Sequence, residues 1–456
     1  IVFGDWSSDV CSSDLGGWFV EYSGYKWQMS IGELDQRSIY KGYENVRMDF
    51  GLDEFLRFCQ SLNIEPHITI SFLNSTPEDA ANLVEYCNGD TNTVFGSLRA
   101  KNGHNQPYNV KIWEIGNEIW ENPINYANGF IKFYDSMKRK DPTISCIISA
   151  DIWQWKPFFD TLMTIIGEKC DIYGWHWTQP HKNLEPATSE EIYKVVVGGS
   201  LYTEFSLDSV DKWIGKLGLK NNLTQAITEV WATYDPNVYE WSYDTVARAG
   251  SLENGLWMAS QIMSCIKKSD KLSILEKTIA VTTYRTEINI HEGIRESYKT
   301  PSLLACIMAR NHYGTERLQT SVKSEKYSVR TIKGLFNAKD INYLDIVVTA
   351  SDDSIFIFSL NRHPKDFIDT YFSFSDTLVY RKSKIYELYS PDYLDKNTAI
   401  EKEKIQISEQ MIEFNDYYKF PPHSFTIIAV PIKKPTNVSN EDRKSTRLNS
   451  SHRIRS

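Results

Sequence analysis

The sequence feature that most constrains the fold is a regular alternation, from Trp18 to about Tyr313, of short β-branched or apolar runs with longer helical patterns. This alternation is typical of βα units around a parallel sheet, which is either a closed barrel or a doubly wound open sheet. No G-x-G-x-x-G or G-K-[ST] phosphate loop follows any of the runs, which removes the main reason to prefer a doubly wound sheet. We therefore expect an α/β fold of the (β/α)8 TIM-barrel type. The expected strands are His67–Phe72, Val110–Gly116, Ile144–Ala150, Asp171–His176, Thr224–Glu229 and Thr278–Tyr284, with Gly16–Val20 as the end of an earlier one.

After about Gly314 the sequence changes to alternating strands separated by turns such as Ser351-Asp352-Asp353. Such a run of short alternating strands predicts an antiparallel β-sandwich. We place the catalytic barrel in residues 16–314 and the C-terminal sandwich in residues 315–434. The expected sandwich strands are Leu344–Ala350, Ile355–Leu360, Phe367–Phe374, Lys384–Leu388 and Phe425–Val430.

Both ends of the chain read unlike natural protein. Gly4–Leu15 and Asp442–His452 back-translate into strings that resemble a sequencing-library adapter, and the two strings are nearly reverse complements of one another. We therefore set residues 1–15 and 442–456 aside as non-native. The expectation is that the native sequence begins near Gly16 and that the first strand of the barrel and most of the second are missing. A signal peptide cannot be read, so the compartment stays open, with a cytoplasmic location favoured.

Composition narrows the class of partner. The formal net charge is −9, which disfavours nucleic acid, because a protein that binds a polyanion needs a basic surface. No uncharged apolar run approaches the roughly 20 residues that a membrane span needs, so no membrane partner is expected. Aromatic residues make up 13% of the chain, and their flat faces suit stacking on sugars, although core packing explains most of them. The seven cysteines lack C-x-x-C spacing and are expected to be buried free thiols.

Two glutamates stand at the ends of predicted strands. The apolar strand Ile112–Gly116 leads into Asn117-Glu118, and Ala226-Ile227-Thr228 leads into Glu229. The carboxyl ends of barrel strands form the face on which active sites are built. Retaining glycoside hydrolysis needs two carboxyl groups roughly 5–5.5 Å apart, one protonated and one ionised. We expect Glu118 and Glu229 to be this pair, with burial raising the pKa of one acid and hydrogen bonds keeping the other ionised.

Neighbouring residues suggest how the pair is supported. Asn117 is placed to hold the sugar 2-hydroxyl, and His176 lies in an aromatic cluster with Trp177, where it can orient a carboxylate. Glu114, further down its strand, reads as a buried salt-bridging acid, and His67 as a satisfied core residue. No H-E-x-x-H motif or paired histidine spacing occurs, so neither a metal nor a cofactor is expected. No G-x-S-x-G elbow points to a serine hydrolase.

The sequence resembles glycoside hydrolase family 51, the α-L-arabinofuranosidases, over almost all of Gly16 to about Ile432. The resemblance implies a clan-A barrel with an appended sandwich and the removal of terminal α-L-arabinofuranosyl groups from arabinan, arabinoxylan or oligosaccharides by double displacement, without a cofactor. By position it makes Glu118 the acid/base, Glu229 the nucleophile, and Asn117 and His176 residues of the sugar site. The strings that carry it are Gly16-Gly17, Phe19-Val20-Glu21, Asp53-Glu54-Phe55, Thr76–Ala81, Glu85–Gly89, Pro107–Val110, Trp113–Glu118, Ser359–Pro364 and Pro421–Ser424.

Some positions depart from the family pattern. Trp18 stands where a small or polar residue is usual, in a loop that lines the sugar site, and Trp177-Thr178 replaces a tyrosine pair after His176. Trp18 and Trp177 are therefore expected to contact the substrate and to change its fit. Two alternatives stay open: an endo-acting β-glucanase or xylanase on the same barrel, and a weakly catalytic carbohydrate-binding relative. Whether the chain forms a homo-oligomer is also open.

Overall fold

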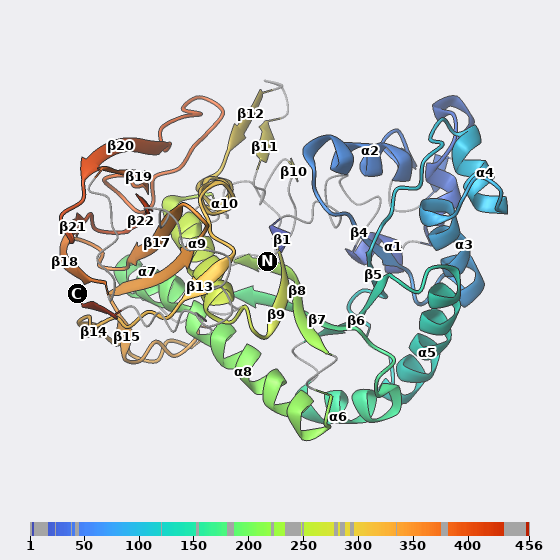
Figure 1. The fold of residues 1–456 in the computed structure, drawn as a ribbon, viewed down its shortest axis with the longest axis horizontal. Helices are drawn as coiled ribbons and strands as arrows, with labels where there is room; N and C mark the ends of the chain where they lie inside the picture. The colour runs from blue at the N-terminus through green and yellow to red at the C-terminus, as the bar shows by residue number, and fades with distance from the viewer. Residues whose placement is uncertain are drawn as a thin grey trace, which may run out of the picture. The chain divides into compact units, whose positions relative to one another are not determined.

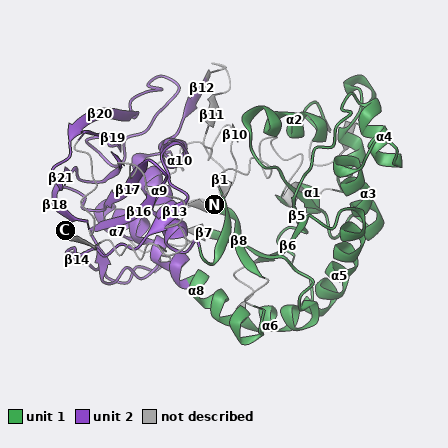
Figure 2. Ribbon diagram, in the orientation of Figure 1, with its two compact units in different colours: residues 1–177, 206–231, 270–282 green, residues 178–205, 232–269, 283–456 purple. Residues whose placement is uncertain are grey.

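A computed structural model describes most of the chain: residues 2–3, 17–22, 24–37, 39–41, 45–119, 121–151, 155–179, 187–219, 223–232, 248, 250–277, 281–282, 288–291, 296–333, 335–374, 382–432 and 453–455. The chain divides into two compact units (Figure 2). The first unit comprises residues 1–177, 206–231 and 270–282, and the second comprises residues 178–205, 232–269 and 283–456.

The first unit is built on a seven-stranded sheet with the order β1-β9-β8-β7-β6-β5-β4. The neighbouring strands whose register is defined run parallel, as the alternation in the sequence predicts. Parallel order brings the carboxyl ends of the strands to one edge, so residues that follow different strands can meet there. The strands are β1 (Val2–Phe3), β4 (His67–Ile70), β5 (Ile112–Ile115), β6 (Ser145–Asp151), β7 (Ile172–Gln179), β8 (Thr224–Ala232) and β9 (Leu272–Lys277).

Helices α3 (Pro77–Asn88), α5 (Pro123–Lys140) and α6 (Trp155–Ile166) lie on the outer side of this sheet (Figure 1). Helix α3 begins as its sequence predicts: the Thr76 hydroxyl accepts a hydrogen bond from the Asp79 amide at 3.1 Å, and Pro77 occupies the first helical position. The predicted apolar face of α2 is buried at Leu52, Phe55, Leu56 and Cys59. The helices are α1 (Gly17–Tyr22), α2 (Leu52–Leu62), α3 (Pro77–Asn88), α4 (Val94–Lys101), α5 (Pro123–Lys140), α6 (Trp155–Ile166) and α8 (Ser200–Lys216), the last of which spans the boundary between the units.

The second unit contains the antiparallel sheets of the predicted sandwich. A six-stranded sheet has the order β13-β16-β17-β22-β19-β20, and a three-stranded sheet has the order β21-β18-β23. Apolar residues from both sheets share one core, in which Ile346, Ile357 and Ile428 pack in the same cluster as Phe372 and Phe420. The strands are β13 (Glu316–Leu318), β16 (Leu344–Ala350), β17 (Ser354–Asn361), β18 (Ile368–Ser373), β19 (Lys382–Leu388), β20 (Ile407–Glu413), β21 (Tyr417–Phe420), β22 (Ser424–Pro431) and β23 (Arg453–Arg455).

Other elements complete the chain. Helices α9 (Leu252–Lys267) and α10 (Pro301–Asn311) lie in the second unit, as does α7 (Ser189–Gly198). The remaining short elements are η1 (Trp27–Ser30), η2 (Leu34–Gln36), β2 (Ile39–Lys41), β3 (Asn45–Arg47), β10 (Val281–Thr282), β11 (Ile288–His291), β12 (Glu296–Lys299), β14 (Lys326–Tyr327) and β15 (Ile341–Asn342).

Two expected strands were wrong. Gly16–Val20 was expected to end a strand, but residues 17–20 belong to helix α1, and Gly16 lies outside the described residues. The last strand of the parallel sheet is β9, Leu272–Lys277, and not Thr278–Tyr284. Of the expected segment, only Val281 and Thr282 are described, and as β10 they belong to a different sheet. The β-branched residues of Thr278–Tyr284 suggested a strand. The strand forms earlier in the chain because Leu272, Ile274 and Leu275 are buried there. Most of residues 1–15 and 442–456 lie outside the described residues.

The cysteines behave as expected of free thiols. Cys59, Cys87, Cys146, Cys170 and Cys265 are buried and Cys306 is half-buried, and none of these six forms a disulfide. Cys11 lies outside the described residues. Among the helices that the structure describes, none is both long enough and apolar enough to cross a membrane.

Candidate active site

Glu118 follows β5 on a backbone that turns sharply. Gly116 has a φ of 92° and Glu118 a φ of 47°, both in the left-handed region. A Cβ at position 116 would lie 2.7 Å from the side chain of Ile119, so only glycine fits there. For a glutamate this conformation is uncommon and costs energy, and residues held this way cluster at functional sites.

Hydrogen bonds from three elements hold the Glu118 backbone in place. The Tyr22 hydroxyl of α1 donates to the Glu118 carbonyl at 2.8 Å, and the Glu118 amide donates to Ser149 Oγ of β6 at 3.3 Å. Tyr126 of α5 donates to the Ile115 carbonyl at 2.5 Å and accepts from the Ser149 amide at 3.0 Å. The turn that aims Glu118 is therefore fixed from several sides.

His176, near the end of β7, joins the two candidate carboxylates. Its Nδ1 lies 3.1 Å from Glu118 Oε1, and its Nε2 lies 3.7 Å from Glu229 Oε1. The imidazole is 3% exposed, whereas the side chains of Glu118 and Glu229 are 27% and 13% exposed. One ligand atom from each of the three residues lies within 4.8 Å of the others, so the carboxyl groups are at the separation that double displacement requires.

The charges of this trio are tightly linked. Burial lowers the pKa of His176, but the Glu229 charge and the Glu118 hydrogen bond outweigh it and raise that pKa to about 10. Burial raises the pKa of Glu118, but the hydrogen bond and charge of His176 outweigh it, so the net pKa is lowered. The raised pKa that one acid was expected to have is thus not found at Glu118, because the sequence could not place a cation 3.1 Å away.

Asn117, another predicted site residue, lies beside the same acids. It is 2% exposed, and a Cβ added to Gly17 would lie 4.0 Å from Asn117 Oδ1 and 3.5 Å from Glu229 Oε1. Trp177 is 4% exposed and packs edge-on against Trp175, with ring centroids 6.2 Å apart. Trp177 is therefore a buried packing residue and not an open stacking platform, and side chains alternate along β7, so it points to the face opposite His176. The backbone of Trp18 lies in α1, but its side chain is outside the described part of the structure, as is that of Thr178.

Glu21, which the sequence analysis did not single out as a site residue, also reaches this region. It is fully buried, and its carboxylate accepts from the amides of Phe72 at 2.9 Å and Leu73 at 2.6 Å. Burial raises its pKa to about 7, against the effect of these bonds and of one from the Asn117 backbone. The only sequence signal was its place in the family-like string Phe19-Val20-Glu21.

A second acidic layer lies deeper between the strands. His67 Nδ1 is 3.0 Å from both carboxylate oxygens of Glu276, and its Nε2 is 3.5 Å from Glu114 Oε2. All three side chains are at most 3% exposed. Glu114 and His67 are both buried, as expected, and Glu114 lies within ion-pairing distance of His67. Glu276 was missed because the last strand was expected further along the chain.

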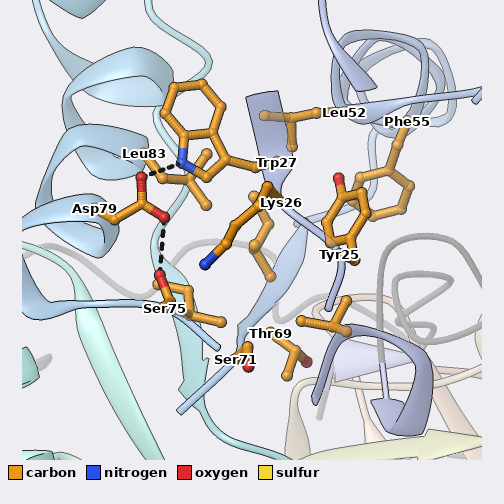
Figure 3. Close-up of a pocket in the computed structure, with 13 residues that line it drawn as sticks. Tyr25, Lys26, Trp27, Leu52, Phe55, Thr69, Ser71, Ser75, Asp79 and Leu83 are labelled. Carbon is orange, nitrogen blue, oxygen red and sulfur yellow. Dashed lines mark hydrogen bonds between the residues drawn. The ribbon is translucent and has the colours of Figure 1, made fainter. Parts of the chain in front are cut away.

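A cavity of about 40 Å³ lies beside β4, and neither Glu118 nor Glu229 lines it (Figure 3). Trp27, Ser75 and Asp79 line it, and Asp79 accepts hydrogen bonds from Trp27 Nε1 at 3.2 Å and Ser75 Oγ at 2.9 Å. The space suits a few water molecules and not a sugar ring. It is not part of the candidate active site.

Within the described residues, Glu118, His176 and Glu229 are also the group whose geometry could hold a metal ion. An ion there would use the same oxygens that a two-carboxylate mechanism needs. The expectation that the reaction uses neither metal nor cofactor stays a prediction.

Comparison with known proteins supports the family resemblance. Residues 15–184 match the family model described as Alpha-L-arabinofuranosidase 1 domain. A curated relative from Aspergillus terreus, "Probable alpha-L-arabinofuranosidase C", is 25% identical over 438 residues, which cover 89% of this chain and 82% of the relative. "Alpha-L-arabinofuranosidase C" of Emericella nidulans is 23% identical with the same coverage. The crystal structure of an α-L-arabinofuranosidase from Thermotoga maritima in complex with arabinose superimposes with a TM-score of 0.79 at 25% identity, covering 91% of this chain and 86% of that one. The expected fold class, a TIM-type barrel sheet with a β-sandwich, is thereby confirmed.

Proposed function

We propose that this chain, which belongs to the α-L-arabinofuranosidases of glycoside hydrolase family 51, releases arabinofuranosyl groups from glycans by a retaining double displacement. The observation that carries the proposal is the proximity of Glu118, which follows β5, to Glu229, which lies in β8, with carboxylate oxygens within 4.8 Å and His176 between them. An inverting enzyme keeps its carboxyl groups roughly 6.5–9.5 Å apart to admit water, which is wider than the spacing here.

In the first step, a carboxylate oxygen of Glu229 attacks the anomeric carbon and the bond to the leaving oxygen breaks. Glu118 protonates that oxygen, so the leaving group departs as an alcohol and the sugar remains as an ester of Glu229. In the second step, Glu118 takes a proton from water, the water oxygen attacks the anomeric carbon, and the ester bond to Glu229 breaks. Two inversions give net retention.

The source of the proton follows from the Glu118–His176 pair. With the pKa of Glu118 lowered and that of His176 raised to about 10, the pair holds one proton, mainly on the imidazole. We propose that Glu118 delivers this proton across the 3.1 Å hydrogen bond. As Glu229 gives up its negative charge to the ester, the largest contribution raising the pKa of His176 disappears, and the proton becomes easier to release. His176 is thus a proton store as well as an orienting residue.

We assign sugar contacts to the residues around the carboxylates. Asn117 holds the 2-hydroxyl, and Gly17 leaves the space that a side chain would fill next to Glu229. Trp18 is proposed to contact the substrate through its position next to Gly17, whereas a substrate contact by Trp177 stays a prediction, because Trp177 is buried against Trp175. The substrate class is an arabinofuranosyl-containing oligo- or polysaccharide.

The test is hydrolysis of p-nitrophenyl α-L-arabinofuranoside by the wild type, Glu118→Ala and Glu229→Ala. We expect losses of kcat of at least about 10³-fold in both variants, and azide should restore turnover in each. Azide should yield the α-azide with Glu118→Ala and the β-azide with Glu229→Ala, which separates the two roles. Turnover of xylan or β-glucan in place of the arabinofuranoside would favour the endo-acting alternative, and no turnover by folded protein would favour a binding role.

A further inference from the structure

We propose that His67 is a positioning residue for the catalytic carboxylates, acting through Glu114 from the layer beneath them. This inference rests on the proposed function, because it concerns how the nucleophile Glu229 and the proton store His176 are held. The mechanism above does not use His67, Glu114 or Glu276.

His67 connects strands that lie far apart in the order of the sheet. It stands on β4, Glu114 on the adjacent β5, and Glu276 on β9, with four strands between β4 and β9 in the sheet order. The 3.0 Å contact between His67 and Glu276 therefore joins β4 to β9 across the inner face of the curled sheet. The two carboxylates face opposite nitrogens of one buried imidazole, Glu276 at Nδ1 and Glu114 at Nε2.

Glu114 links His67 to the strand of the proposed nucleophile. Its Oε2 faces His67, while its Oε1 accepts a hydrogen bond from the hydroxyl of Thr228 at 3.3 Å. Thr228 immediately precedes Glu229 on β8. The same carboxylate therefore ties the strand of the acid/base to the strand of the nucleophile.

Glu114 also lies close to the strand of His176. A Cβ at Gly174, two residues before His176, would lie 3.4 Å from Glu114 Oε1, so the absence of a side chain there leaves room for the carboxylate. The charged groups that act on His176 are Glu229 from β8 and Glu118 and Glu114 from β5. If His67 fixes Glu114, it also fixes part of the field in which His176 holds its proton.

A buried ion cluster can also be purely structural, and such clusters are weak evidence for function. A structural role predicts lost stability with unchanged chemistry in the surviving folded protein. A positioning role predicts a fall in kcat at nearly constant KM, because a small displacement of reacting groups is costly in rate. The chain offers a matched control in Asp53, which is 2% exposed and accepts hydrogen bonds from Tyr86 at 2.7 Å and Tyr108 at 2.9 Å, neither of which is a proposed catalytic residue.

The experiment compares His67→Asn, Glu114→Gln and their double variant with Asp53→Asn, all assayed well below their melting temperatures. We expect kcat to fall about 10- to 100-fold in each of the first two, with KM within about 2-fold, and the double variant to lose little more than either single one. Asp53→Asn should keep kcat within about 2-fold. Unchanged kcat in His67→Asn, or fully additive losses in the double variant, would overturn the proposal.

Two further measurements cover variants that do not fold and a failure of the proposed function. Thr228→Val keeps the ion cluster and removes only the hydrogen bond to Glu114, so kcat should fall about 5-fold or more, and an unchanged kcat would count against the proposal. The imidazole nitrogen signals of His176, recorded by NMR on 15N-histidine-labelled protein, require no substrate. They should shift in His67→Asn and not in Asp53→Asn, and identical signals would sink the positioning role even if the enzyme proved to act on another glycoside.

Discussion

The imidazole of His176 approaches Glu229 to 3.7 Å through Nε2 while its other nitrogen is engaged with Glu118. A cation between two acids makes the protonation of each depend on the other two. Tests of the site can therefore be made through pH as well as through mutation.

Replacing His176 with asparagine should lower kcat/KM about 10- to 100-fold near neutral pH, because the proton store is lost. The wild-type pair is expected to keep its proton until the pH approaches the His176 pKa of about 10. In the variant Glu118 must keep the proton alone, so the alkaline limb of the kcat/KM profile should move to lower pH. The pH profile of both proteins checks this, and an alkaline limb that stays in place would contradict the proposed store.

The same histidine should link stability to pH. Its folded pKa is raised above the ordinary value of 6.5, so its contribution is fully present below about pH 6.5 and is lost as the pH rises through about 10. The difference in melting temperature between the wild type and His176→Asn should therefore shrink across this range. Calorimetry at several pH values measures it, and a difference that grows with pH would refute the linkage.

Glu21 should act in the opposite sense to an ordinary paired carboxylate. Its folded pKa is raised from 4.5 to about 7, so the unfolded chain ionises first and the native state loses stability as the pH rises from about 4.5 to 7. Glu21→Gln removes this loss, and its melting temperature relative to the wild type should rise over the same interval. A constant difference would mean that Glu21 is already ionised in the folded protein.

Gly17→Ala tests the space beside the nucleophile. The residue has a φ of 57°, and its new Cβ would lie 3.5 Å from Glu229 Oε1. Gly24→Ala is the control, because Gly24 has a φ of 77° and no atom within 4 Å of an added Cβ. Both variants should lose about 1–2 kcal/mol of stability from the left-handed backbone, but only Gly17→Ala should lose about 10-fold or more in kcat/KM. Equal activity in the two variants would mean that the sugar does not occupy this space.

A stability prediction concerns the second unit alone. Asp345 is 7% exposed and pairs with Arg362 at 2.9 Å and Lys267 at 2.8 Å, and although burial raises the pKa of Asp345, these cations hold it well below its usual range. Asp345→Asn leaves the buried Arg362 without its anion and should cost about 3–5 kcal/mol. The loss should be full above about pH 4 and should decline as the pH falls, since protonation removes the same charge in the wild type. Denaturant unfolding of the variant and the wild type, at one pH above about 4 and at one pH well below it, measures this change in the free energy of unfolding.

The sequence predicted the parallel sheet and most of the sandwich because apolar residues there form short runs or alternate with polar residues in a clear pattern. The polar strand Ile407–Glu413 was missed, since its outward residues Glu409, Gln410 and Met411 show no alternation. Glu118 and Asn117, which follow β5, and His176 and Glu229, which lie toward the carboxyl ends of β7 and β8, were found because these strand ends share one edge. Glu21 and Gly17 were not, because their segment was expected to end a strand and instead forms the short helix α1, and their approach to the site depends on tertiary contacts. The lowered pKa of Glu118 could not be predicted, since it depends on the distance to His176.

The left-handed backbone at Glu118 has a consequence for attempts to improve this enzyme. The conformation costs about 1–2 kcal/mol for a residue with a side chain, and the bonds from Tyr22 and to Ser149 compensate for it. Residues that tolerate this conformation better, such as asparagine, would satisfy the local backbone and abolish proton transfer. A screen that rewards heat resistance alone would therefore drift toward inactive sequences at this turn, so directed evolution of the chain should hold positions 22, 118 and 149 constant and seek its gains elsewhere.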